Sequence, residues 1–187
     1  MTLTLSLLIS IGLAMDAFAV SISKGLSSIE NHVKLGLKLA LTFGLFQSGM
    51  TLLGYFGGLS FRSLIEGFDH WIAFGLLLLV GGKMIYEALF EKEEEESAET
   101  GILSTKTLLI LGLATSIDAM VVGISFSILN FSLVLPVILI GVVTALFSFL
   151  GVFIGKWAGH LLGKQAEVVG GLILIGIGIK ILFEHLG

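Results

Sequence analysis

The sequence of 187 residues contains no cysteine, only one proline and only 13% charged residues. The absence of cysteine excludes disulfides and thiolate metal sites. The charged fraction is about half of the roughly 25% typical of soluble domains, which excludes a water-soluble globular protein. No basic patch is present that could bind nucleic acid. With 56% apolar residues and 25 glycines, the composition instead indicates closely packed membrane helices.

Six stretches are apolar and long enough to cross a bilayer, which takes about 20 residues. They lie near residues 3 to 23, 37 to 58, 70 to 89, 106 to 128, 133 to 155 and 167 to 185. The segment Asn130 to Pro136 (NFSLVLP) predicts the turn between the fourth and fifth spans. The first stretch lacks the basic flank of a signal peptide and carries an acid, so we expect a retained helix. The expected fold is an all-α polytopic membrane protein with six transmembrane helices.

Lysine and arginine are concentrated on one side of the expected membrane. Two basic residues, Arg62 and Lys180, fall on the other side. Because basic residues collect on the cytoplasmic side, we expect both termini outside and the acidic linker, residues 91–105, in the cytoplasm. The basic residues of the cytoplasmic loops are Lys24, Lys34, Lys38, Lys92, Lys106, Lys156 and Lys164.

The two halves of the sequence resemble each other in three places and in the same order. The matched segments are LAMDAFAVSIS (13–23) with LATSIDAMVVGIS (113–125), LLGYFGG (52–58) with FIGKWAG (153–159), and GGKMIYE (81–87) with GIKILFE (178–184). The first match aligns Asp16 with Asp118 after a two-residue insertion. Three matches in register indicate a duplication. Since each unit has three spans, residues 1–90 and 106–187 are expected to form inverted three-helix repeats, as in secondary transporters.

Two of the three aspartates, Asp16 and Asp118, lie near the middle of their spans. A central Asp costs about 2.5–3.5 kcal/mol on insertion scales, so both should face the bundle interior and have partners. No lysine or arginine is expected deep enough to act as a fixed counter-ion. Two nearby carboxylates then either share a proton or hold a cation. There are two alternatives to a metal site. The two aspartates could form a mutual acid pair that only stabilises helix packing, or they could carry protons without binding a metal.

The polar side chains expected near the same depth are oxygen donors. Oxygen ligands without Cys or a central His suit hard divalent cations such as Mg²⁺ and Mn²⁺. The buried amide of Gln47 either completes the ion shell or ties two helices together. The candidate metal ligands are Asp16, Asp118, Gln47, Ser21, Thr115 and Ser148.

Two lysine–glutamate pairs lie four residues apart in the third and sixth spans. They are Lys83 with Glu87 and Lys180 with Glu184, and each pair shares a helix face. Lysine side chains that extend their ammonium groups toward the membrane surface, each paired with the nearby glutamate, explain these two pairs. A role in gating the two mouths of a transport path is the alternative.

The motifs GLAMDAFAVSISKG (12–25), ATSIDAMVVGISF (114–126) and GGKMIYE resemble the bacterial manganese efflux pumps of the MntP type. The resemblance covers essentially the whole chain. It implies export of Mn²⁺ through the bacterial inner membrane, with Asp16 and Asp118 as the essential metal-binding acids and no cofactor. At the position of Gln47 the family has an acid or an amide. A proline often follows where this chain has Thr51.

Secondary transport by alternating access is the favoured function, since no Walker A motif is present to use ATP. Proton antiport fits carboxylates that release a metal. An exporter of an amino acid or other small solute is an alternative, although no cation for a substrate carboxylate is apparent. An intramembrane aspartyl hydrolase also needs two aspartates, but its GxGD loop is absent. We therefore expect a transporter that is not an enzyme.

Overall fold

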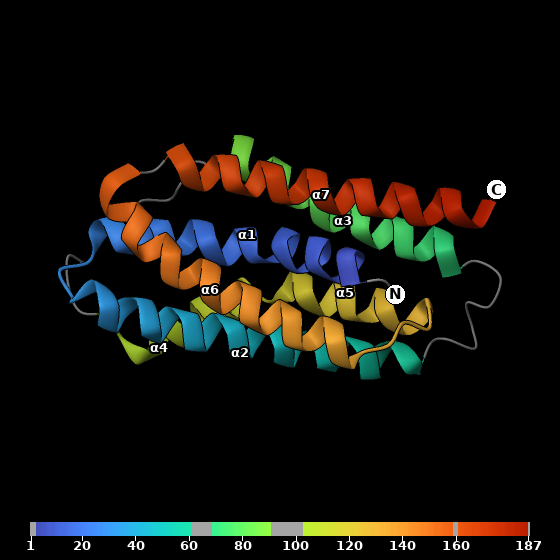
Figure 1. Cartoon of the computed structure of the whole chain (residues 1–187), viewed down its shortest axis with the longest axis horizontal. Helices are drawn as coiled ribbons and strands as arrows, with labels where there is room; N and C mark the ends of the chain where they lie inside the picture. Colours follow the sequence, from blue (N-terminus) through green and yellow to red (C-terminus); the bar gives the residue numbers. More distant parts are fainter. Residues whose placement is uncertain (1–2, 61–68, 91–102, 159–160, 187) are drawn as a thin grey trace.

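The computed structural model describes residues 3–60, 69–90, 103–158 and 161–186, and every regular element within these ranges is an α-helix. The helices are α1 (Leu3–Ser27), α2 (His32–Leu59), α3 (Asp69–Phe90), α4 (Thr105–Ala114), α5 (Ile117–Ile128), α6 (Val134–Ala158) and α7 (Leu161–Leu186). α1, α3 and α6 run in one direction along the bundle, and α2, α4, α5 and α7 run in the other (Figure 1). Both termini lie toward the same end of the bundle (Figure 1). The all-α prediction is confirmed.

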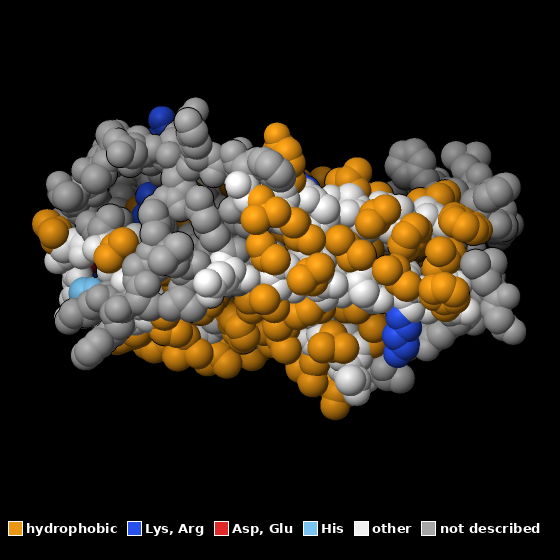
Figure 2. Space-filling view, turned by 90° about the horizontal axis from the view of Figure 1, so that it is seen from above, with side chains coloured by type: hydrophobic (Ala, Val, Ile, Leu, Met, Phe, Trp, Pro, Cys, Tyr) orange, Lys and Arg blue, Asp and Glu red, His pale blue; other side chains and the backbone are white. Residues whose placement is uncertain are grey.

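The described helices have the length and apolarity of membrane spans. Four stretches meet both criteria, namely Leu3–Leu26, His32–Leu59, Thr105–Ile128 and Val134–Gly155. α3 and α7 contain shorter apolar stretches, but with 22 and 26 residues both are long enough to cross about 30 Å of hydrocarbon. Hydrophobic side chains cover much of the outer surface (Figure 2), as expected for helices that face lipid. The protein is therefore a polytopic membrane protein.

The fourth span is not the continuous helix that the sequence predicted. α4 ends at Ala114 and α5 begins at Ile117, with Thr115 and Ser116 in a turn between them. This turn falls at the two residues inserted before Asp118 relative to the first half of the chain. Two extra residues in a continuous helix would rotate all later side chains by about 200°. Opening the helix at this point avoids that rotation.

The turn between α5 and α6 lies where the sequence predicted it. Asn130 has a φ of 58°, a left-handed conformation that asparagine tolerates better than most residues. Pro136 lies in the first turn of α6, where its missing N–H breaks no helical hydrogen bond.

Glycines allow the helices of the two halves to pack closely. α1 packs mainly on α6, α2 on α5 and α6, and α3 on α7. A Cβ on Gly54 of α2 would collide with the backbone of Met120 in α5. In the same way, a Cβ on Gly151 of α6 would meet the backbone of Phe18 in α1. Close backbone contact of this kind is how membrane helices associate where lipid offers no hydrophobic drive.

These contacts place the second sequence match one helical turn away from the predicted register. Phe18 and Met120 are equivalent when the two aspartates are aligned. Their glycine partners, Gly151 and Gly54, should then be equivalent too, which pairs LLGYFGG with FLGVFIG (149–155). The resulting spacing of 97 residues is the one that also relates GGKMIYE to GIKILFE.

A carboxylate in the loop between α1 and α2 ties the two halves of the chain together. Glu30 accepts hydrogen bonds from the Lys38 ammonium at 2.8 Å and from the Leu103 N–H, just before α4, at 2.7 Å. The hydrogen bond from Lys38 lowers the pKa of Glu30 below its ordinary value, against the opposing effect of burial. The Leu103 N–H lowers this pKa further.

Replacing Glu30 with Gln should lower the free energy of unfolding by about 1–3 kcal/mol at pH 7, because charged hydrogen bonds are lost. Since folding lowers this carboxyl pKa, the stabilisation is present above the unfolded value of about 4.3 and is lost as the pH falls through the folded value. Thermal unfolding midpoints of the wild type and Glu30→Gln should therefore differ at pH 7 and converge in acid. Lys38→Met should lower the midpoint at pH 7, whereas the control Lys34→Met should change it less. A difference between wild type and Glu30→Gln that does not vary with pH would contradict this role.

Candidate functional site

Asp118 forms an ion pair deep in the bundle. It lies in the first turn of α5, directly after the break, and its side chain is only 7% exposed. The Lys83 ammonium of α3 lies 3.3 Å from one of its carboxylate oxygens and 3.4 Å from the other. The prediction that no lysine or arginine reaches an aspartate is therefore wrong for Asp118. The long lysine stem reaches inward from a backbone position about two turns before the end of α3.

Gln47 of α2 is fully buried and joins two elements of the site. Its Nε2 donates to the Leu13 carbonyl of α1 at 3.3 Å and to the Thr115 carbonyl in the α4–α5 break at 3.0 Å. Each carbonyl belongs to the residue three positions before an aspartate, Asp16 or Asp118. Gln47 therefore holds together the two turns that carry the aspartates. Its own Oε1 is buried and has no hydrogen-bond partner among the described residues.

Asp16 and Asp118 lie on either side of Gln47 along the bundle. Asp16 is half-buried in α1, which runs opposite to α5 (Figure 1). Each aspartate comes three residues after the carbonyl that Gln47 binds, so Asp16 is displaced from this level toward one end of the bundle and Asp118 toward the other. The Cα–Cβ bonds of a helix tilt toward its N-terminus, so each side chain leans back toward the level of Gln47. The backbones of the two aspartates therefore lie on opposite sides of the level of Gln47 along the bundle.

The hydroxyl candidates differ in whether the backbone already uses them. Ser21 and Thr115 each donate to a carbonyl of the preceding helical turn, at 2.6 Å and 3.0 Å respectively. Ser148 of α6 is buried, and its Oγ has no hydrogen-bond partner within the described part of the chain. The same is true of Thr144, one turn earlier on the same helix face. Of the hydroxyls considered, Ser148 and Thr144 are therefore the ones left for a ligand.

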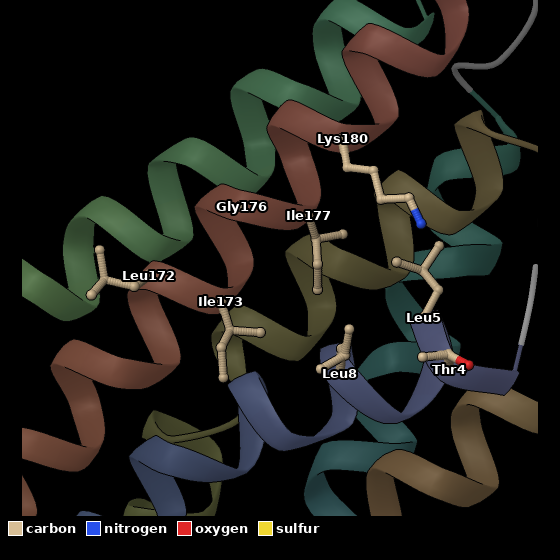
Figure 3. Close-up of a pocket in the computed structure, with 8 residues that line it drawn as sticks. All are labelled: Thr4, Leu5, Leu8, Leu172, Ile173, Gly176, Ile177 and Lys180. Carbon is tan, nitrogen blue, oxygen red and sulfur yellow. The ribbon is translucent and has the colours of Figure 1, made fainter.

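Lys180 occupies a different environment from Lys83, its match in the first half. It lines a largely apolar pocket of about 260 Å³ between α1 and α7, and its ammonium points toward Leu5 and Thr4 (Figure 3). Asp16 lies three helical turns farther along α1, roughly 16 Å away along the axis. The predicted partners of the two lysines, Glu87 and Glu184, have side chains outside the described residues, so these pairs stay predictions.

The candidate donors are the carboxylates of Asp16 and Asp118, the buried Oε1 of Gln47 and the hydroxyls of Thr144 and Ser148. Within the described ranges, no three His, Cys, Asp or Glu side chains gather closely enough to hold a metal by themselves. A cation bound here would therefore need neutral oxygens beside the aspartates. Such a mixed oxygen set suits hard ions such as Mg²⁺ and Mn²⁺ and disfavours zinc or copper.

Comparison with known proteins gives a consistent result along nearly the whole chain. The family model described as "Putative manganese efflux pump" matches residues 30–182. No solved structure is significantly similar. Three similar proteins, each described as "Putative manganese efflux pump MntP", come from Gloeothece citriformis, Clostridium perfringens and Methanospirillum hungatei. They are 51%, 48% and 46% identical to this chain, respectively. The matches cover 96%, 94% and 97% of this chain and 94%, 92% and 93% of the respective relative. The chain therefore belongs to the manganese efflux pump family.

Proposed function

We propose that the protein exports Mn²⁺ across the cell membrane as a secondary transporter, with Asp16 and Asp118 as its charged ligands. The observation that carries the proposal is the position of Gln47, whose Nε2 ties the turns before both aspartates. Its buried Oε1 has no hydrogen-bond partner among the described residues and would supply a neutral oxygen between them. The names of the relatives agree with this cargo.

The buried oxygens without partners support a cation at this site. A buried polar atom that lacks a hydrogen bond costs about 1–3 kcal/mol, so each calls for a ligand or another partner. Gln47 Oε1, Thr144 Oγ1 and Ser148 Oγ are such atoms. Together with the two carboxylates, they approach the six or so oxygen ligands that a hard divalent cation takes. In this proposal Ser21 and Thr115 contribute less, because their hydroxyls donate to the backbone.

Alternating access would arise from two inverted repeats, residues 1–90 and 106–187, joined by the linker 91–105. The opposite directions of α1 and α5 support this arrangement (Figure 1). The equivalent glycine contacts of α2 with α5 and of α6 with α1 support it as well. Rocking of one repeat against the other would expose the aspartates to each side in turn. Uptake of protons by carboxylates that have released Mn²⁺ would couple export to the proton gradient.

The orientation we propose places both termini outside and the linker in the cytoplasm. Lys24, Lys34 and Lys38 lie around the loop between α1 and α2, at the bundle end opposite to the termini (Figure 1). Basic residues favour the cytoplasmic side. Asp16 would then lie on the cytoplasmic side of Gln47, where the ion enters, and Asp118 on the outer side.

The other functions considered from the sequence have less support. The family is one of efflux pumps and not of enzymes, which removes the hydrolase alternative. An exporter of amino acids needs a cation for the substrate carboxylate, and Lys83 is engaged with Asp118.

Inverted membrane vesicles from cells that express the chain should accumulate Mn²⁺ well above vesicles from cells that lack it, because inversion turns export into uptake. A protonophore should slow this uptake if transport is coupled to protons. The measurement is the initial rate of ⁵⁴Mn²⁺ uptake at equal amounts of folded protein. Uptake of a labelled amino acid without uptake of Mn²⁺ would instead support the small-solute exporter and refute the proposal.

A further inference from the structure

We infer that Lys83 is an internal competitor of the transported cation at Asp118 and holds this carboxylate when the metal is absent. The inference rests on the proposed function, because it concerns how the same site binds and releases its ion. It starts from the ion pair in which the Lys83 ammonium lies 3.3 and 3.4 Å from the two carboxylate oxygens.

The ammonium occupies the position that a metal ion would need. It is almost equidistant from both oxygens of Asp118, so it lies in front of the carboxylate where bidentate coordination would place the ion. A hard divalent cation binds oxygen at about 2.0–2.6 Å and would then lie very close to Nζ. In a medium of low dielectric, repulsion between the two positive charges is too strong for both to stay. Metal binding at Asp118 therefore requires Lys83 to move away.

Lys83 is the more exposed member of the pair. Its side chain is 39% exposed, whereas that of Asp118 is 7% exposed. Lysine carries a compact charge on a flexible stem, so it can swing outward without a change in the backbone. The buried carboxylate would then have a positive partner both with and without metal. The returning ammonium also weakens metal binding, which assists release from an exporter.

The second half of the chain offers a matched control for this idea. Lys180 is equivalent to Lys83 by the match of GGKMIYE with GIKILFE, yet its ammonium lies near Thr4 and Leu5 at the start of α1 (Figure 3). A neutral substitution of Lys180 removes the same charge from the matching position of the other repeat. It does so without touching the Asp118 ion pair.

The test measures Mn²⁺ binding to the purified full-length chain in lipid nanodiscs by isothermal titration calorimetry at pH 8. Lys83→Met should bind Mn²⁺ at least about tenfold more tightly than the wild type, because no ion pair must be broken. Lys83→Arg should retain an affinity near that of the wild type or weaker, since a guanidinium also pairs with a carboxylate. Lys180→Met should leave the affinity unchanged. If Lys83→Met unfolds, Lys83→Gln provides the same comparison with a polar replacement.

The possible failures are distinguishable. Equal dissociation constants for the wild type and for the folded Lys83 variants, or weaker binding by the neutral variants, would overturn the inference and leave Mn²⁺ binding intact. Equal tightening by Lys180→Met would also overturn it, because the effect would then be one of net charge. Absence of Mn²⁺ binding by the folded wild type and all variants would refute the proposed function, and the inference with it.

Discussion

Replacing Asp118 with Asn should lower the initial rate of Mn²⁺ uptake into inverted vesicles at least about 100-fold, because a neutral amide cannot offset the cost of desolvating a divalent cation. Asp16→Asn should have a similar effect. In the proposed path an ion that crosses the bundle passes both aspartates, because Asp16 lies in α1 on the other side of the level of Gln47. The measurement is the rate of ⁵⁴Mn²⁺ uptake at equal amounts of protein in the membrane.

Glu30→Gln is the control for this experiment, because it also removes one negative charge but does so in a loop outside the spans. Its uptake rate should stay close to that of the wild type at temperatures well below its unfolding midpoint. Rates in Asp118→Asn that equal those of the wild type would show that this carboxylate is not a ligand.

The ion pair with Lys83 makes it necessary to separate lost binding from lost stability. Asp118→Asn removes the buried carboxylate that pairs with the Lys83 ammonium, and removing one member of such a pair destabilises a protein more than replacing both members. The double variant Asp118→Asn with Lys83→Met should therefore recover much of the unfolding midpoint without recovering transport. Recovery of transport together with stability would contradict the assignment of Asp118 as a metal ligand.

Much of the architecture follows from the sequence because lipid imposes strong constraints. A span must be apolar over about 20 residues, so runs without charge locate the helices closely. A central aspartate is costly unless it faces the interior, which singles out Asp16 and Asp118. Gln47 stands out for the same reason, and the structure confirms that it ties two helices together. Whether its Oε1 also binds metal stays a prediction.

The features that the sequence did not predict depend on geometry that hydropathy does not record. Lys83 lies close enough to the end of α3 to be taken as an interfacial residue, and only the packing of α3 near α5 brings it to Asp118. The break before Asp118 resolves an insertion that was visible in the alignment but compatible with several local structures. The glycine contacts favour a register for the second repeat match that differs by one turn from the predicted one, because segments with glycine at intervals of four match one another at more than one offset.

Replacing Gly54 with Ala should lower the free energy of unfolding by about 3 kcal/mol, the upper end of the usual range for overpacking. A Cβ at this position would collide with the Met120 carbonyl, and a backbone group cannot move aside as a side chain can. α5 would have to move away from α2 by a substantial fraction of the diameter of a methyl group. The measurement is the midpoint of thermal unfolding in detergent, which should fall by roughly 6–12 °C for a chain of this size.

Gly57→Ala is the matched control, because Gly57 is three residues away on the same helix and has nothing within 4 Å of the position of a Cβ. Alanine favours a helix by up to about 1 kcal/mol relative to glycine, so this variant should be as stable as the wild type or more stable. Gly54→Ala should also reduce Mn²⁺ uptake even where it remains folded, since moving α5 from α2 stretches the hydrogen bond from Gln47 to the Thr115 carbonyl. Equal midpoints for the two variants would mean that α2 and α5 approach less closely than the structure has them. A folded Gly54→Ala with normal uptake would mean that transport tolerates a looser link between Gln47 and the turn before Asp118.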